Sequence, residues 1–355
     1  MPLKCSALKA SKPLGIVVVL LVAWLLAMGF SAQQLDRVEL SYPEAWPKPE
    51  YNFKRSPLSQ QGIDLGRALF YDPILSRNNT TSCSTCHLSY TAFTHVDHAL
   101  SHGINDSIGT RNSPVLVNLA WNKLFMWDGA VNHLDVQALA PIAHPAEMGN
   151  SIEAAVASVQ AQRKYRGLFH DAFGDSTVTG ERLLKALSQF QLTLVSANSK
   201  YDKVMRQEPD VAFTEQEARG YQLFQQHCNS CHTEPLFTNG AFANNGLLPD
   251  STLNDPGRMG ITQRKKDSLK FKVPTLRNIE FSFPYMHDGR FVRLGQVMRH
   301  YTKEVYDTPT LAPELRGNVP LTEVEQLDII AFLFTLTDKE FLFNPDHAFP
   351  RPSQN

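Results

Sequence analysis

The sequence predicts an all-α protein built from two similar units, and three observations carry this prediction. The pattern Cys-x-x-Cys-His occurs twice, at residues 83–87 and 228–232. Apolar residues recur at helical spacing around both copies, whereas alternating, strand-like runs are scarce. The chain has 355 residues, of which 43% are hydrophobic, and this is ample for two packed cores. We therefore expect one helical unit around each copy of the pattern.

The N-terminal segment predicts export from the cytoplasm. Three lysines precede an uncharged apolar run over residues 15–32. This run is longer than a usual signal-peptide core and barely reaches the span of a bilayer. Residues 1–32 are therefore interpreted as a signal peptide or as an uncleaved membrane anchor, and the Pro-rich residues 33–57 as a tether. The positive-inside rule places the remaining chain outside the cytoplasm in both cases.

Three helices can be placed along the rest of the chain. Capping boxes, in which threonine is followed three residues later by glutamate, open two of them at Thr214 and Thr322. Apolar residues stand at helical spacing in all three: Leu183, Leu187, Phe190 and Leu194 in the first; Tyr221 and Phe224 in the second; Val324, Leu327, Ala331 and Phe334 in the third. The second helix runs directly into Cys228.

The two units are expected at residues 58–207 and 208–345, followed by a tail at 346–355. The boundary is placed in the polar stretch 207–210, which contains Pro209. A helix that enters Cys-x-x-Cys-His, with an amphipathic terminal helix packed across it, is the plan of class I cytochromes c. Here the plan appears twice, so the expected fold is two class I cytochrome c-like domains.

Each Cys-x-x-Cys-His pattern predicts the covalent attachment of one haem c. The two cysteines can form thioether bonds with the haem vinyl groups, and the histidine that follows can bind the iron. A thiol redox pair or half of a zinc site is the alternative, but both copies end in histidine and only Cys5 remains to complete a four-cysteine site. The predicted haem-binding residues are Cys83, Cys86 and His87 for the first haem, and Cys228, Cys231 and His232 for the second.

The charge balance excludes one class of partner. Lys and Arg together number 34 against 35 for Asp and Glu, so the formal net charge is -1. No basic excess is available to hold a phosphate backbone, and nucleic acid is not an expected partner.

Six further short sequences follow one another along the chain in a fixed order. They are RNSP at 111–114, FMWDG at 125–129, QALAPI at 137–142, EMG at 147–149, VPTLRN at 273–278 and PYMHDGR at 284–290. Together they resemble the bacterial di-haem cytochrome c peroxidase and MauG family over nearly everything after about residue 55. The joint occurrence of these motifs is highly specific for the family.

The resemblance implies that hydrogen peroxide reacts at the first haem, on His87. It makes Glu147 the acid/base and Gln137 the pocket amide, with Pro141 shaping the distal wall, and peroxide cleavage needs such groups. Trp127 matches the tryptophan that lies between the haems and helps electrons cross. From the sequence position alone, Glu147 would be interpreted as a solvated carboxylate and Trp127 as a core aromatic.

The sixth ligand of the second haem distinguishes the branches of the family. Counting forward from His287, the position matching the methionine ligand of ordinary peroxidases is Tyr301, as in MauG-like proteins. Met298 lies one helical turn earlier and shares its helix face. A thioether favours Fe(II), whereas a phenolate favours the higher oxidation states. We expect Tyr301 to be the ligand, with Met298 as the alternative.

Two more sites follow from the resemblance. Asn112 by its side chain, with Ser282 and Pro284 by their carbonyls, matches a calcium site, and oxygen ligands suit this hard cation. The loop after the first motif resembles the MauG type, which lacks the histidine that caps the iron in ordinary peroxidases. Three histidines nevertheless lie nearby, namely His95, His98 and His102. Each is expected to be a surface residue, which leaves the first iron open.

We therefore expect a periplasmic di-haem peroxidase that reduces hydrogen peroxide at the His87 haem with electrons delivered through the His232 haem. If the signal is retained, residues 15–32 anchor it to the inner membrane. A small cytochrome c or cupredoxin is the expected electron donor, and a homodimer is one candidate assembly. The first alternative is a MauG-like oxidase that directs a high-valent iron state at a protein or organic substrate. The second is a pure electron-transfer cytochrome, which would need neither Gln137 nor Glu147.

Overall fold

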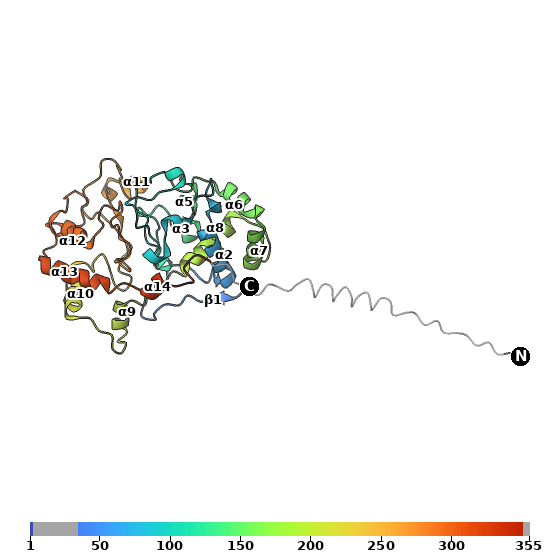
Figure 1. Cartoon of the computed structure of the whole chain (residues 1–355), viewed down its shortest axis with the longest axis horizontal. Coiled ribbons are helices and arrows are strands. Elements are labelled where there is room, and N and C mark those ends of the chain that lie inside the picture. Colours follow the sequence, from blue (N-terminus) through green and yellow to red (C-terminus); the bar gives the residue numbers. More distant parts are fainter. Residues whose placement is uncertain (3–34, 351–355) are drawn as a thin grey trace. The chain divides into compact units, whose positions relative to one another are not determined.

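The computed structural model describes residues 1–2 and 35–350, and the part of the chain that it describes is rich in helix with little sheet (Figure 1). This confirms the helical character predicted from the sequence. Strands within these residues form only two short antiparallel pairs: β1 (Arg37–Val38) with β2 (Leu58–Ser59), and β3 (Phe242–Ala243) with β4 (Phe271–Lys272). Residues 36–350 belong to one compact unit.

Two helices cross tightly in the first half of the chain. Helix α2 (Gln60–Tyr71) begins at Ser59, whose side chain accepts a hydrogen bond from the Gly62 amide, and α8 (Gly180–Leu192) is capped by a threonine in the same way. The two helices meet at Gly66, where an added Cβ would come within 1.9 Å of the Ala186 carbonyl oxygen. Glycine therefore lets the two backbones approach each other.

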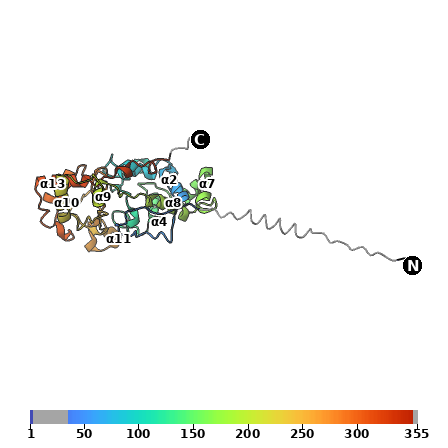
Figure 2. The same cartoon turned by 90° about the horizontal axis from the view of Figure 1, so that it is seen from below.

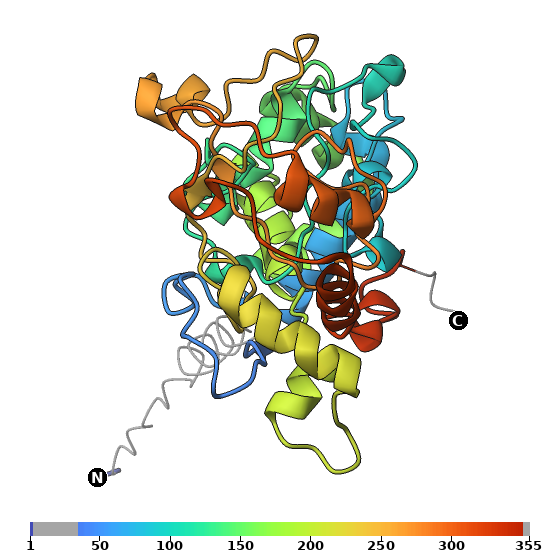
Figure 3. The ribbon, with the colours of Figure 1, turned by 90° about the vertical axis from the view of Figure 1, so that its left-hand side faces the viewer.

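The same arrangement recurs in the second half. Helix α10 (Glu215–His227) and helix α13 (Glu323–Phe334) open with the capping boxes predicted at Thr214 and Thr322. They lie side by side (Figures 2 and 3) and meet at Gly220, where a Cβ would come within 1.9 Å of the Asp328 carbonyl oxygen. The prediction that α10 runs into the second motif is also confirmed, because Cys228 caps its C-terminus.

The buried face of α13 differs from the predicted stripe. Val324, Leu327 and Phe334 are exposed, whereas the helix packs through Phe332 and Leu333. This helix is apolar on more than one side, so periodicity alone could not choose the buried face. The close crossing with α10 determines which side turns inward.

Shorter elements connect the two crossing pairs. Within residues 35–350 the remaining α-helices are α3 (Cys83–Cys86), α4 (Leu134–Gln137), α5 (Leu139–Ala143), α6 (Ile152–Ala161), α7 (Arg163–Phe173), α9 (Lys200–Met205), α11 (Met259–Thr262), α12 (Leu294–Lys303) and α14 (Lys339–Leu342). The 3₁₀ turns are η1 (Pro73–Leu75), η2 (Ser89–Thr91), η3 (Ile104–Asp106), η4 (Leu119–Trp121), η5 (Lys265–Asp267) and η6 (Pro313–Leu315). Long irregular segments separate them.

Most of the buried apolar residues form two clusters, one around each crossing pair. Trp46 and Phe341 belong to the cluster around α2 and α8, so segments from both ends of the described chain pack on the first core. Tyr201 of α9 belongs instead to the cluster around α10 and α13. The chain therefore crosses between the two cores more than once.

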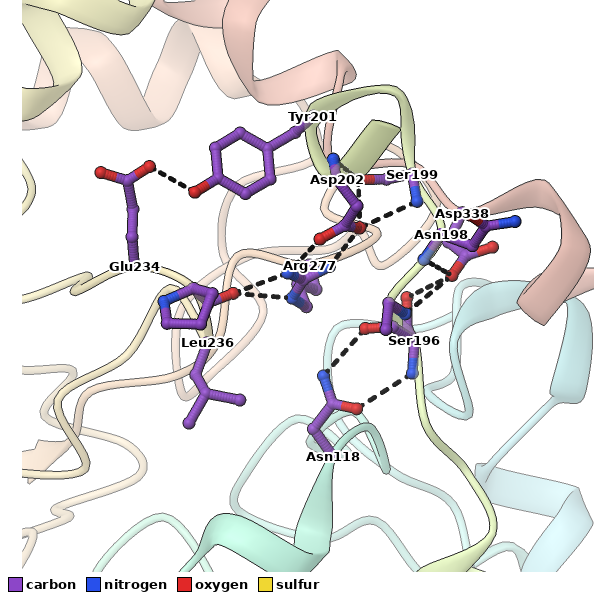
Figure 4. A network of polar contacts seen from close by, with 12 residues as sticks. Asn118, Ser196, Asn198, Ser199, Tyr201, Asp202, Glu234, Leu236, Arg277 and Asp338 are labelled. Carbon is purple, nitrogen blue, oxygen red and sulfur yellow. Dashed lines mark hydrogen bonds and ion pairs between the residues drawn. The ribbon is translucent and has the colours of Figure 1, made fainter. Parts of the chain in front are cut away.

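A buried polar network holds the segment between α8 and α9 in place (Figure 4). Asp202 forms a two-pronged ion pair with Arg277, with both N–O distances at 2.8 Å, and the side chains are only 3% and 0% exposed. Asp338 accepts a hydrogen bond from the Ser196 hydroxyl at 3.1 Å. Ser196 also exchanges two hydrogen bonds with the Asn118 side chain. The network ties residues that are far apart in the sequence.

No helix among residues 35–350 is long and apolar enough to cross a membrane. The export signal or anchor predicted at residues 1–32 lies almost entirely outside the described residues.

Candidate functional site

The two Cys-x-x-Cys-His motifs open onto one cavity of about 870 Å³. Of the predicted site residues that line it, the haem-binding ones are Cys86, His87, Cys228, Cys231 and His232, and the others are Asn112, Trp127, Gln137, Pro141, Glu147, Ser282, Pro284, Met298 and Tyr301. Among the predicted site residues only Cys83 is missing from the lining. Residues that are spread over more than 200 positions of the chain are thus brought together.

The first motif forms the short helix α3, and its histidine is oriented by a loop carbonyl. Nδ1 of His87 lies 2.6 Å from the carbonyl oxygen of Phe93. A carbonyl can only accept, so this contact places the ring proton on Nδ1 and leaves Nε2 with a free lone pair. Ala92 and Phe93 adopt positive φ angles of 57° and 58°, and this turn presents the carbonyl to the ring. Burial lowers the pKa of His87 to about 4, which keeps the imidazole neutral.

The second motif is oriented by two carbonyls. Nδ1 of His232 lies 3.2 Å from the Phe237 oxygen and 3.1 Å from the Pro274 oxygen. Burial again lowers the pKa of this histidine, so the neutral ring presents Nε2 as a ligand.

The four motif cysteines have free thiols. Burial raises the pKa of Cys83 and Cys228 to about 12 and that of Cys86 to about 11. Each motif therefore offers two unbonded thiols and a neutral, oriented imidazole at the edge of a large shared cavity. This donor set fits a covalently attached haem c at each motif, with the cysteines on the vinyl groups and the histidine on the iron.

Glu147 and Gln137 reach the cavity from the segment around α4 and α5. Burial raises the pKa of Glu147, and the nearby His144, with Nδ1 3.7 Å from Oε1, opposes this shift. Gly103 packs against the backbone of Glu147, because a Cβ there would lie 2.5 Å from the Glu147 Cα. Nε2 of Gln137 contacts the Met126 sulfur at 3.4 Å. A partly buried carboxyl and an amide are thus held at one wall of the cavity.

Trp127 is fixed from two sides. Its indole Nε1 donates a hydrogen bond to the Asn112 carbonyl at 2.8 Å. Its own carbonyl accepts one from the Lys272 amide at 2.7 Å. The ring therefore belongs to the contact between the segment that carries the first motif and the segment that follows the second.

Asn112, Ser282 and Pro284 line the cavity together. The side-chain amide of Asn112 donates to the Ala99 carbonyl at 3.0 Å. Their role as calcium ligands stays a prediction.

Tyr301 and Met298 both lie in α12 and both line the cavity. Burial raises the pKa of Tyr301 to about 12, with Asn245 opposing the shift through a hydrogen bond. Met298 is 7% exposed and belongs to the second apolar cluster. Both side chains line the same cavity as the second motif, so the choice of ligand stays a prediction.

The three loop histidines lie outside the cavity lining. The rings of His98 and His102 stack at a centroid distance of 4.2 Å, and His95 stacks on His98 at 5.1 Å. Nδ1 of His95 is buried without a hydrogen-bond partner. They pack on one another, and none of the three lines the cavity.

Several groups that shape this site were not predicted from the sequence. The Phe93, Phe237 and Pro274 carbonyls orient the two histidines, yet backbone carbonyls leave no residue-type signal. Lys272 lines the cavity directly before the VPTLRN motif, but Lys265, Lys266 and Lys270 precede it closely, so no sequence signal distinguished it. His144 stands three residues before Glu147, a spacing that could have suggested their contact.

Comparisons with known proteins agree with this arrangement. A model of the di-haem cytochrome c peroxidase family matches residues 60–210. The methylamine utilization protein MauG of Methylorubrum extorquens is 35% identical over 305 residues, covering 83% of this chain and 82% of that protein. The cytochrome c551 peroxidase of Nitrosomonas europaea is 34% identical over 310 residues, covering 84% of this chain and 86% of that protein.

A solved structure is similar over most of the chain as well. It is a MauG-like protein associated with microbial copper homeostasis, with a TM-score of 0.77 and 30% identity over 88% of this chain and 99% of that one. The relatives thus include both cytochrome c peroxidases and MauG proteins. With both haem motifs opening onto one cavity and relatives of this identity and coverage, the chain belongs to the di-haem cytochrome c peroxidase family of oxidoreductases.

Proposed function

We propose that this protein reduces hydrogen peroxide to water at a haem bound by His87, with electrons delivered through a second haem bound by His232. Each turnover consumes one peroxide, two electrons and two protons and releases two waters. The haem irons supply the redox chemistry that amino-acid side chains lack. The observation that carries this proposal is the single cavity lined by both motifs together with Gln137 and Glu147.

The side chains at the first site supply the proton chemistry. Glu147 takes a proton from the inner peroxide oxygen and returns it to the oxygen that leaves. Its raised pKa brings a carboxyl group closer to the working pH, where it can both accept and release a proton. Gln137 now contacts only a weak acceptor, the Met126 sulfur, so its amide is readily available to hold peroxide. Pro141 closes the wall beside them.

Electrons cross from the second site to the first through the region that Trp127 occupies. The two hydrogen bonds that fix this residue support the assignment, because a rigid aromatic ring between two redox centres keeps the electron path constant. A small periplasmic cytochrome c or cupredoxin then reduces the second haem. Calcium on Asn112, Ser282 and Pro284 would strengthen the same contact region.

We also propose that residues 58–207 and 208–345 are two class I cytochrome c-like domains. The support is the repeated helix crossing, with Gly66 between α2 and α8 and Gly220 between α10 and α13. Each crossing pair is associated with one haem motif.

The alternative is a MauG-like oxidase that uses the oxidising equivalents of peroxide on a protein or organic substrate. Two observations favour it. Tyr301 lines the cavity near the second motif, and the histidines at 95, 98 and 102 stack together outside the lining, which supports an uncapped first iron. The two functions share the peroxide reaction and differ in the final electron source.

Stopped-flow mixing of the haem-loaded protein with peroxide tests the proposal. With a reduced small cytochrome c as donor, we expect continuous peroxide consumption with two donor molecules oxidised per peroxide. Peroxide consumption without donor oxidation, accompanied by modification of an added protein or organic substrate, would favour the alternative. A protein that exchanges electrons with the donor but leaves peroxide intact would be an electron carrier, and both peroxide-based functions would be wrong.

A further inference from the structure

Lys272 places a cation in the haem cavity without an acidic partner. Its Nζ donates a hydrogen bond to the Leu124 carbonyl at 3.1 Å, and no ion pair joins it to a carboxylate within residues 35–350. Burial lowers the pKa of Lys272 to about 8, and no neighbouring charge opposes this shift. An ammonium group is therefore held in a largely apolar space with one neutral hydrogen-bond acceptor.

The other lysine and arginine side chains of the cavity lining are compensated. Arg111 forms ion pairs with Asp128 and Asp255, each at 2.6 Å. Lys123 pairs with Glu50 at 3.1 Å, and its side chain is 75% exposed. Lys272 differs from both, because it is partly buried and has no counter-charge within residues 35–350. Burying an unpaired ammonium group is costly, so a site of this kind implies an anion.

The backbone of Lys272 lies between the two haem motifs. Its amide donates to the Trp127 carbonyl at 2.7 Å, on the side of the first motif. Two residues later, the Pro274 carbonyl contacts Nδ1 of His232 at 3.1 Å. The segment that carries Lys272 therefore contacts both motif regions, and Lys272 lines the cavity that they share.

The anion that fits this site is a carboxylate of the bound haem itself. A haem attached by its vinyl groups keeps two ionised propionates, and the donor set of both motifs fits such a haem. We propose that the ammonium group of Lys272 binds a haem propionate. Lys272 is then a positioning residue, which holds a positive charge beside that haem. The inference rests on the proposed attachment of haem at both motifs.

This pairing has an electrostatic consequence. A fixed positive charge near a haem edge favours the reduced iron, because reduction adds a negative charge. At a separation of about 10 Å and an effective dielectric of about 20, one unit charge changes the reduction equilibrium by roughly tenfold or more. Tenfold corresponds to about 59 mV for a one-electron couple. Removal of the charge should lower the potential of the haem whose propionate it binds.

Potentiometric titration of the holoenzyme tests the proposal, with three variants chosen for charge and position. Lys272→Met removes the charge at similar length, and Lys272→Arg keeps it. Lys123→Met is the matched control, because this lysine also borders the cavity but is solvated and paired. We expect Lys272→Met to lower the potential of one haem by about tenfold in the reduction equilibrium, equal to about 59 mV. The other two variants should stay near the parent.

Two further measurements separate the possible failures. Covalent haem is counted first, because fewer than two haems in the parent protein would defeat the proposed attachment rather than the role of Lys272. Resonance Raman bands of the propionates should then shift in Lys272→Met and remain in Lys272→Arg. If Lys272→Met assembles poorly, a holoenzyme crystal structure decides, since Nζ must lie within hydrogen-bond distance of a propionate oxygen. Two intact haems with unchanged potentials, or a propionate beyond reach of Nζ, would overturn the proposal.

Discussion

Nδ1 of His87 lies 2.6 Å from the Phe93 carbonyl, whereas Nδ1 of His232 lies 3.1 and 3.2 Å from two carbonyls. A shorter hydrogen bond from Nδ1 makes the imidazole a more basic ligand. A more basic ligand favours higher oxidation states of the iron it binds. The histidine at the site assigned to peroxide should therefore stabilise higher oxidation states of its iron more than the histidine at the site assigned to electron transfer.

The first prediction concerns haem attachment. Cys86→Ser and Cys231→Ser each remove one thioether position, so each variant should hold the haem at that motif by a single thioether bond, with a changed haemochrome spectrum. The parent should show two covalent haems per chain in a pyridine haemochrome assay. Cys5→Ser is the control and should retain both, because Cys5 lies far before either motif in the sequence. Haem that is extracted from the parent by acid acetone would contradict the prediction.

The second prediction concerns proton transfer. Glu147→Gln keeps the size of the side chain but cannot accept a proton, so peroxide turnover should fall by roughly two to four orders of magnitude. Both haems should remain bound. Glu153→Gln, in the first turn of α6, is a matched control outside the cavity lining and should turn over at the parent rate. Parent-like turnover in Glu147→Gln would remove Glu147 from the mechanism.

The third prediction concerns pH. The carboxylate form of Glu147 is the one that accepts a proton, so turnover should fall as the pH drops through the pKa of Glu147. Burial raises this pKa and His144 opposes the rise, so His144→Asn should move the acidic limb of kcat/KM for peroxide to higher pH. His170→Asn, which changes a half-exposed histidine on α7, should leave the limb in place. A limb that moves toward lower pH in His144→Asn would contradict the assignment.

The sequence predicted the parts of the fold that depend on local chemistry. The capping boxes at Thr214 and Thr322 are satisfied within four residues of the chain, and both helices begin where expected. The inward face of α13 was not predictable, because it is set by contact with Gly220, more than a hundred residues away. Likewise, the residues of the site could be named from motifs, but their meeting in one cavity depends on tertiary packing.

The groups that orient the two histidines show the same limit. Phe93 acts through its carbonyl, which every residue type carries. The turn that orients this carbonyl has positive φ at Ala92 and Phe93, and because neither residue is glycine, the sequence does not indicate such a turn. Lys272 could not be predicted for another reason. Its importance comes from the lack of an acidic partner for its ammonium group, and only the tertiary packing around it reveals this.

The fourth prediction decides between the two ligands proposed for the second haem. If Tyr301 binds the iron, Tyr301→Phe should change the optical and EPR spectra of the second haem, and Met298→Leu should leave them unchanged. The fully ferric protein should then react with peroxide without prior reduction, since the loop histidines lie outside the cavity. A ferric protein that is inert until half-reduced, with spectra that respond to Met298→Leu, would place the chain with the His/Met peroxidases.

The fifth prediction concerns the helix crossing that frames the second site. Gly220→Ala puts a methyl group 1.9 Å from the Asp328 carbonyl and 2.9 Å from the Phe332 Cβ, so α10 and α13 must separate. Overpacking of this kind costs roughly 3 kcal/mol or more, because backbone cannot move aside as a flexible side chain can. Since α10 runs into Cys228, the second haem spectrum should change with it.

A control for this variant is available within another helix of the chain. Gly167 in α7 has nothing within 4 Å of the position of an added Cβ, so Gly167→Ala gains helix propensity without a clash. It should raise the free energy of unfolding by about 0.5–1 kcal/mol. Thermal and urea unfolding of the two holoenzyme variants beside the parent would measure both changes. The essential outcome is that the two changes in the free energy of unfolding have opposite signs. Reduced flexibility of the unfolded chain alone would stabilise both variants, so destabilisation of Gly220→Ala must come from the close backbone contact at Gly220.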